Sequence, residues 1–168
     1  MRIMLIFIRN IEAICAGVCF TLMLLLINVE VFRRYVFMSP GAYSEEVAKF
    51  LSIYSIFFSM AYAVKENAHI VTDILPDNLP VRVSTAIDIF ANVAFLAFSM
   101  LMIYFGIEYT QSMYLFERPT EAMSAPLWIF ITILPIGFAL TSVRLLLKLR
   151  LLVRAMKTGE KIQTVEIF

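Results

Sequence analysis

The sequence predicts an all-α integral membrane protein that crosses the bilayer four times. Hydrophobic residues make up 61% of the chain and charged residues only 16%, whereas a soluble domain carries about 25% charged residues. The mean hydropathy is +0.86. Four apolar runs each approach the roughly 20 residues that a helix needs to cross about 30 Å of hydrocarbon. We expect one membrane domain, with spans at about residues 10–32, 44–65, 82–107 and 125–148.

The first span is expected to remain as an anchor, because no small-x-small cleavage site follows its apolar run. Lysine and arginine gather at the N-terminus, in the link between the second and third spans, and from Arg144 into the tail at residues 149–168. Because positively charged flanks stay in the cytoplasm, both termini are expected there. The basic tail also suits contact with anionic lipid headgroups. Nucleic acid binding is not implied.

A charged junction separates the first two spans, and it is the main candidate for a functional site. The Ser-Pro-Gly run at residues 39–41 is expected to end the first helix. Ser44 is a suitable N-cap for the second helix. Glu45 and Glu46 then fall in its first turn, where the positive end of the helix dipole favours carboxylates.

Three basic residues, Arg33, Arg34 and Lys49, complete this junction. Glu30 precedes Arg34 by four residues, a spacing that favours an ion pair along an extended first helix. Lys49 follows Glu45 by the same interval. It can pair with that carboxylate, reach to the membrane interface or contact another subunit, and the sequence leaves these alternatives open.

The link between the second and third spans is expected to contain a short interfacial amphipathic helix. Its apolar residues recur at helical spacing, at positions 70, 71, 74 and 75. His69 and Asp73 lie on the other faces of this helix. They are expected to anchor the link or to contact a partner, and the alternative is that both are simply solvated.

The fourth span carries Pro135 and Gly137 near its middle. Pro135 leaves the carbonyl of Ile131 without its usual helical partner and is expected to kink the helix. Gly137 allows a neighbouring helix to approach closely. Because no charged residue lies nearby, these two residues favour packing over a substrate site.

Residues for catalysis or redox chemistry are missing from the sequence. His69 is the only histidine, which excludes bis-histidine haem ligation within one chain. There is no histidine-rich metal motif and no phosphate-binding glycine loop. Neither enzymatic activity nor a cofactor is expected. The span centres also lack the ionisable group of a self-contained transporter, although a small homodimeric exporter remains the main alternative and a redox subunit the third.

Several short motifs, in their order and spacing, resemble the small membrane subunit of tripartite ATP-independent periplasmic (TRAP) transporters, the DctQ-like family. They are Arg34-Tyr35-Val36-Phe37, Pro40, Ser44-Glu45-Glu46, Ala48-Lys49-Phe50, His69-Ile70-Val71 with Asp73, Ser124-Ala125-Pro126-Leu127-Trp128 and Leu134-Pro135-Ile136-Gly137. The resemblance covers nearly the whole chain. Two departures are Tyr43, where the family usually has Trp, and Ser59-Met60-Ala61, where a glycine-containing patch is common.

The resemblance implies a bacterial inner-membrane complex with a large multispan permease subunit and a periplasmic solute-binding protein. Such complexes import organic acids, sialic acids among them, by symport with sodium or another ion. The large subunit is implied to hold the substrate and ion sites and to move as an elevator, while the small subunit acts as a scaffold. Within that scaffold, Arg34 is expected to pair with Glu46, or with Glu45, and to lock the first two helices together.

Overall fold

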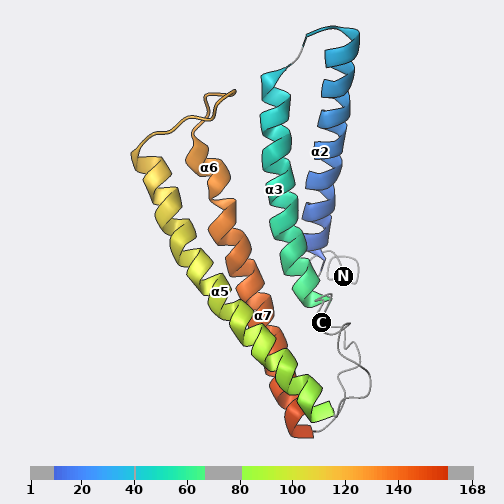
Figure 1. Cartoon of the computed structure of the whole chain (residues 1–168), viewed down its shortest axis with the longest axis vertical. Coiled ribbons are helices and arrows are strands. Elements are labelled where there is room, and N and C mark those ends of the chain that lie inside the picture. Colours follow the sequence, from blue (N-terminus) through green and yellow to red (C-terminus); the bar gives the residue numbers. More distant parts are fainter. Residues whose placement is uncertain (1–9, 40, 67–80, 159–168) are drawn as a thin grey trace, which may run out of the picture.

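The computed structural model describes residues 10–39, 41–66 and 81–158, and every regular element in these ranges is a helix. The helices are α2 (Ile11–Val36), α3 (Ala42–Lys65), α5 (Val81–Leu115), α6 (Leu127–Ile131) and α7 (Ile133–Thr158) (Figure 1). Four candidate membrane spans result, because α6 and α7 together form the fourth. The prediction of an all-α protein with four transmembrane helices is confirmed.

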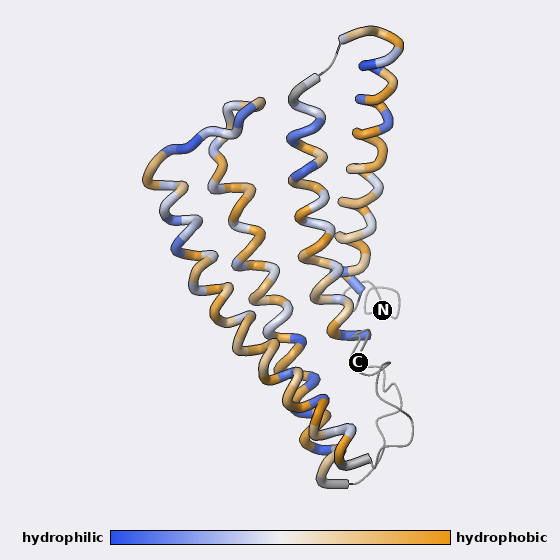
Figure 2. Tube along the Cα trace, in the orientation of Figure 1, coloured by the Kyte–Doolittle hydropathy of each residue, from blue (hydrophilic) through white to orange (hydrophobic). Residues whose placement is uncertain are grey.

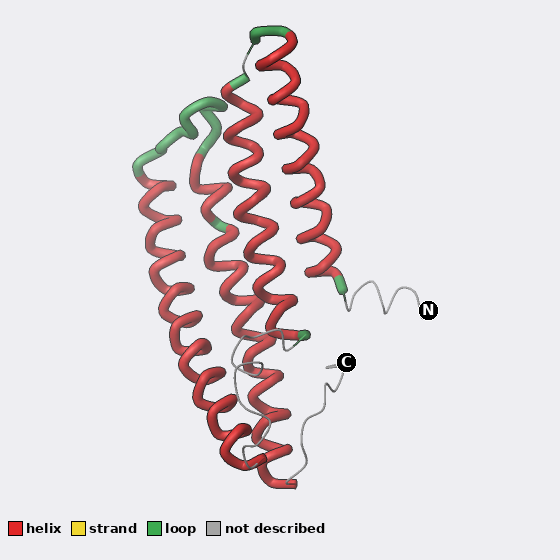
Figure 3. The backbone as a smooth tube through the Cα atoms, turned by 45° about the vertical axis from the view of Figure 1, so that its right-hand side comes forward, coloured by secondary structure: helices red, strands yellow, loops and turns green. Residues whose placement is uncertain are grey.

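The helices form two antiparallel hairpins that pack side by side. α2 packs against α3, α5 packs against α6 and α7, and the two hairpins meet along α3 and α7 (Figures 1 and 3). The α2–α3 loop and the α5–α6 loop lie at the same end of the molecule, which we call the loop end. The opposite end, where α2 begins and α7 ends, we call the terminal end.

Two boundaries differ from those expected from the sequence. α3 begins at Ala42 with Gly41 as its N-cap, so Ser44 lies inside the first turn rather than before it. α5 continues to Leu115, eight residues beyond the expected end of the third span. Glu108 does not interrupt a helix, and the first proline beyond it is Pro119.

Most large apolar side chains point away from the bundle, as expected for helices that face lipid or a membrane partner. Phe20, Leu25 and Phe90 are examples, with 50%, 58% and 75% of their surface exposed. The hydropathy colouring shows this apolar surface along all four long helices (Figure 2). Inside the bundle, Ser99 and Thr141 are fully buried. Their hydroxyls donate to the carbonyls four residues earlier at 2.8 and 2.9 Å, so these buried polar groups are satisfied.

Two buried glycines bring the helices close together. A Cβ added at Gly106 of α5 would lie 2.4 Å from Leu134 Cδ2 and 3.3 Å from Pro135 Cδ. A Cβ added at Gly137 of α7 would lie 2.6 to 2.8 Å from three atoms of Phe57 in α3. The fourth span is interrupted at Thr132, between α6 and α7, three residues before Pro135. Because Phe57 belongs to the first hairpin and Gly137 to the second, Gly137 lies where the two hairpins touch.

Replacing Gly137 with Ala is expected to destabilise the contact between the hairpins by about 1–3 kcal/mol, because the new methyl group would overlap the base of the Phe57 side chain. Thermal unfolding of the purified chain in detergent would measure the loss. Gly17 is the matched control, because no atom lies within 4 Å of the Cβ position there. Gly17→Ala should be neutral or stabilising by up to about 1 kcal/mol. Equal losses at both positions would contradict this packing.

The predicted interfacial helix and the two residues placed on it, His69 and Asp73, lie outside the described residues. The last ten residues of the basic tail, 159–168, lie outside them as well.

Candidate assembly site

An ion pair between Arg34 and Glu45 joins the end of α2 to the first turn of α3. The Arg34 guanidinium Nη2 contacts Glu45 Oε1, and both side chains are about half exposed, at 50% each. An exposed pair of this kind contributes at most about 1 kcal/mol. The pair therefore contributes little to the stability of the hairpin.

A buried carboxylate, Glu30, organises the α2–α3 loop from within. Only 4% of Glu30 is exposed, and its Oε1 accepts a hydrogen bond of 2.6 Å from the amide of Gly41. Arg33 Nη1 lies 3.7 Å from Oε2. A Cβ at position 41 would lie 2.8 Å from Arg33 Nη1 and 3.1 Å from Glu30 Oε2, so only glycine fits here without displacement. Glu30 thus pairs with Arg33, and the pairing with Arg34 expected from the i,i+4 spacing does not form.

Glu46 joins the two hairpins at the loop end. Its carboxylate accepts hydrogen bonds from three consecutive backbone amides of the α5–α6 loop. These are the amides of Glu121 at 2.9 Å, Ala122 at 3.1 Å and Met123 at 2.9 Å. Consecutive amides that converge in this way form an anion-binding nest. The side chain therefore fastens the first turn of α3 to a loop 75 residues further along the chain.

The α5–α6 loop has an internal framework that presents these amides. Thr120 is buried, with 4% of its surface exposed. Its amide donates to the carbonyl of Ala125 at 2.7 Å, and its Oγ1 accepts from the amide of Ala125 at 3.1 Å. The amide of Leu127 donates to the carbonyl of Arg118 at 3.0 Å. Hydrogen bonds between its two sides therefore hold the loop in a defined conformation.

Two polar contacts join helices at the terminal end. Arg144 Nε of α7 lies 3.1 and 3.2 Å from the two carboxylate oxygens of Glu12 in α2. Glu12 is buried, with 6% of its surface exposed. Within the first hairpin, Lys65 Nζ donates to Asn10 Oδ1 at 2.7 Å. The hairpins are therefore joined at both ends, by Glu46 at one and by Glu12 and Arg144 at the other.

The residues singled out in the sequence have different surroundings in the structure. Arg34 contacts Glu45, whereas Glu46 turns to the α5–α6 loop. Ser44 lies within the first turn of α3, where its amide donates to the Gly41 carbonyl at 3.2 Å. Lys49 is exposed, and among the described residues it makes no ion pair.

Glu12 was missed by the sequence reasoning, whereas Glu30 was considered but expected to pair with Arg34 instead of Arg33. The sequence did indicate that both carboxylates need partners. Each lies at one end of an apolar run, where an unpaired charge is costly.

Exchanging the charges of Arg34 and Glu45 tests this assignment of partners. Arg34→Glu or Glu45→Arg alone should lower stability by about 1 kcal/mol or less, because the pair is half exposed. The double exchange should recover most of that loss, as measured by unfolding of the purified chain. Combining Arg34→Glu with Glu46→Arg should bring no recovery, since Glu46 bonds to loop amides. If stability were recovered in Arg34→Glu/Glu46→Arg but not in Arg34→Glu/Glu45→Arg, the observed pairing of Arg34 with Glu45 would be contradicted.

No group of three or more histidine, cysteine or acidic side chains able to hold a metal ion occurs among the residues that the structure describes. Cys15 and Cys19 are free thiols one turn apart on α2. The polar side chains of the two ends are instead engaged in holding helices and loops together. Fold and site together define a small four-span membrane protein whose described polar groups at the two ends join its own helices and loops.

The chain belongs to the DctQ component of the tripartite ATP-independent periplasmic transporters, because the model of that family matches residues 23–155. This is a family of transporter subunits, not of enzymes. The match makes the chain a multi-pass bacterial membrane protein of the TRAP small permease class.

Three relatives illustrate this membership. The chain is 26% identical over 130 residues to the sialic acid TRAP transporter small permease protein SiaQ of Vibrio cholerae, covering 77% of this chain and 74% of the relative. It is 28% identical over 127 residues to the isethionate TRAP transporter permease protein DctMQ of Oleidesulfovibrio alaskensis, covering 72% of this chain and 20% of that one. It is 28% identical over 101 residues to the sialic acid TRAP transporter permease protein SiaT of Haemophilus influenzae, covering 60% of this chain. The match spans only 16% of SiaT, so the chain corresponds to a small part of these two permeases.

Proposed function

We propose that this chain is the static scaffold subunit of a TRAP transporter. It would support a large elevator-type permease subunit and help to dock a periplasmic substrate-binding protein. The observation that carries the proposal is the pair of polar ties between the hairpins, through Glu46 at one end and through Glu12 and Arg144 at the other. A helix bundle whose two hairpins are joined at both ends suits a rigid subunit that stays in place while another subunit moves.

The extent of the matches supports a large partner. In the isethionate and sialic acid permeases the matched stretch is 20% and 16% of the polypeptide, which leaves most of each protein for other parts of the transporter. Where the small permease is a separate chain, as proposed here, a second subunit would have to supply the part of the transporter that lies outside the matched stretch. The apolar surface along its helices would supply the contact area within the membrane.

The proposed orientation follows from charge. Arg144, Lys148 and Arg150 lie toward the terminal end of α7, and the positive-inside rule would place that end in the cytoplasm. The loop end, with Arg34, Glu45 and the α5–α6 loop, would then face the periplasm. There it would be available to a substrate-binding protein. The cargo would be an organic anion driven by an ion gradient, in keeping with the isethionate and sialic acid of the relatives' names.

Co-expression with a large TRAP permease subunit tests the proposal. The tagged chain should retain that subunit through purification in mild detergent. In proteoliposomes, uptake of an organic anion should require this chain, the large subunit and the binding protein together, with an imposed ion gradient. Transport by this chain alone would overturn the proposal and favour a small homodimeric exporter.

A further inference from the structure

We propose that a pocket on the outer half of α5 binds the headgroup and upper acyl chain of an amine-bearing phospholipid, phosphatidylethanolamine. The pocket has a volume of about 550 Å³ and is lined by Met102, Phe105, Gly106, Glu108, Tyr109, Ser112 and Leu134. That volume lies in the usual range for small-molecule sites, about 300–1,000 Å³. This inference is independent of the scaffold role.

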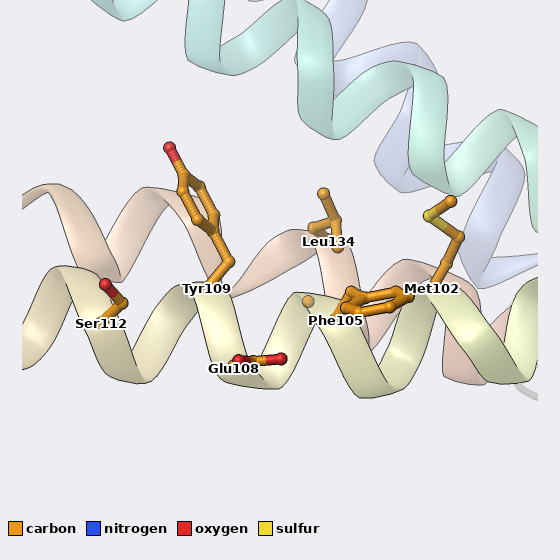
Figure 4. A pocket seen from close by; sticks show the side chains of 7 residues that line it. Met102, Phe105, Glu108, Tyr109, Ser112 and Leu134 are labelled. Atoms are coloured by element: carbon orange, nitrogen blue, oxygen red, sulfur yellow. The ribbon is translucent and has the colours of Figure 1, made fainter.

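The pocket is polar at one end and apolar at the other. Figure 4 shows the polar residues Ser112, Tyr109 and Glu108 along one half of the pocket, with Tyr109 and Glu108 on different sides of α5, and Phe105 and Met102 along the other half. The polar end is the one closer to the α5–α6 loop, because α5 ends at Leu115. A phospholipid has the same order of groups along the membrane normal, with its headgroup outermost.

The length of the pocket matches one leaflet. Met102 and Ser112 are ten residues apart on α5, which corresponds to a rise of about 15 Å. Half of a hydrocarbon core is also about 15 Å. With Met102 near the bilayer centre, the carboxylate and the two hydroxyls would lie at headgroup depth.

The charge of the polar end selects the headgroup. Glu108 is exposed, and it makes no ion pair with any residue that the structure describes. Its carboxylate suits the primary ammonium of phosphatidylethanolamine, which brings three N–H donors. Tyr109 and Ser112 add two hydroxyl groups to the pocket lining, and hydroxyls can donate hydrogen bonds to phosphate oxygens. Choline offers no N–H donor, and phosphatidylglycerol brings a net negative charge toward Glu108.

A helix of a partner subunit is the competing occupant, and the floor of the pocket argues against it. Closely packed membrane helices use exposed small residues as contact points. Gly106 is the small residue here, but it is buried, and Leu134 and Pro135 of α7 already occupy the space over it. A flexible acyl chain fits the remaining irregular surface between Phe105, Met102 and Leu134 better than a second helix.

A single reporter tryptophan tests the site in the full chain. Trp128 is the only tryptophan, so Trp128→Phe with Phe105→Trp moves the reporter into the pocket. In phosphatidylcholine vesicles, brominated-chain phosphatidylethanolamine should quench this tryptophan at about tenfold lower mole fraction than brominated phosphatidylcholine. Glu108→Gln should remove that preference, and Glu108→Lys should transfer it to phosphatidylglycerol. Glu117→Gln, at an exposed acid in the α5–α6 loop, is the matched control and should leave it unchanged.

Equal quenching by all three headgroups, or an unchanged preference in Glu108→Gln, would overturn the proposal. Loss of quenching when the chain is purified with a large permease subunit would also overturn it, because a protein partner would then fill the pocket. Circular dichroism of each variant shows that its helices are intact, so a lost preference reports on the site.

Discussion

Glu46→Ala should release the α5–α6 loop from α3 and lower the stability of the bundle by about 2–4 kcal/mol. The carboxylate accepts three backbone hydrogen bonds from Glu121, Ala122 and Met123. Hydrogen bonds to a charged group contribute about 1.5–3 kcal/mol each, and partial exposure of this site to solvent reduces their sum. Hydrogen exchange followed by mass spectrometry should show these three amides losing protection while the amides of the α5 interior keep theirs.

Two variants isolate the role of the Glu46 carboxylate. Glu46→Gln keeps one acceptor oxygen but loses the charge, so it should fall between the wild type and Glu46→Ala. Glu45→Ala removes the neighbouring, half-exposed acid and should leave exchange at residues 121–123 unchanged. Equal loss of protection in Glu45→Ala and Glu46→Ala would contradict the assignment of the tie to Glu46.

Removing one member of the Glu12–Arg144 pair should cost about 3–5 kcal/mol, because the remaining charge is left buried without its partner. Glu12 is the more buried of the two, so Arg144→Leu is expected to be the more damaging change. Thermal unfolding of the purified chain measures each loss. Arg150→Leu, at an exposed position on the same helix, is the control and should have little effect.

The double variant Glu12→Leu/Arg144→Leu separates pairing from simple loss of charge. Replacing both members of a buried pair with apolar residues is often neutral or stabilising, so the double variant should unfold close to the wild-type temperature. A double variant whose loss equals the sum of the two single losses would show that the residues act independently, against the observed contact.

The spans were predictable from sequence because each depends only on a local run of apolar residues. The end of α5 was not, because a charge at Glu108 resembles a span boundary although it does not stop a helix. Proline and glycine are the usual helix breakers, and neither occurs between Gly106 and Pro119.

The partners of the charged residues were less predictable than the spans. Glu45 and Glu46 are neighbours in sequence, but successive helical residues point about 100° apart. One therefore meets Arg34 and the other meets the α5–α6 loop. Glu12 and Arg144 are separated by 132 residues, so their contact depends on how the two hairpins pack.

Locking the two hairpins together tests the scaffold role most directly. The rings of Phe50 in α3 and Phe130 in α6 stack with their centroids 4.1 Å apart, so cysteines at these positions can be joined by a short cleavable thiol cross-linker. Cys15 and Cys19 would first be replaced with Ala. Each single-cysteine variant, treated with the same reagent, is the control.

The measurement is ion-driven uptake by the cross-linked chain, reconstituted with a large permease subunit and its binding protein. A static scaffold predicts uptake at the same rate before cross-linking, after it and after cleavage of the linker. Uptake that stops on cross-linking and returns on cleavage would show that the hairpins move against each other during transport, and would contradict the scaffold account.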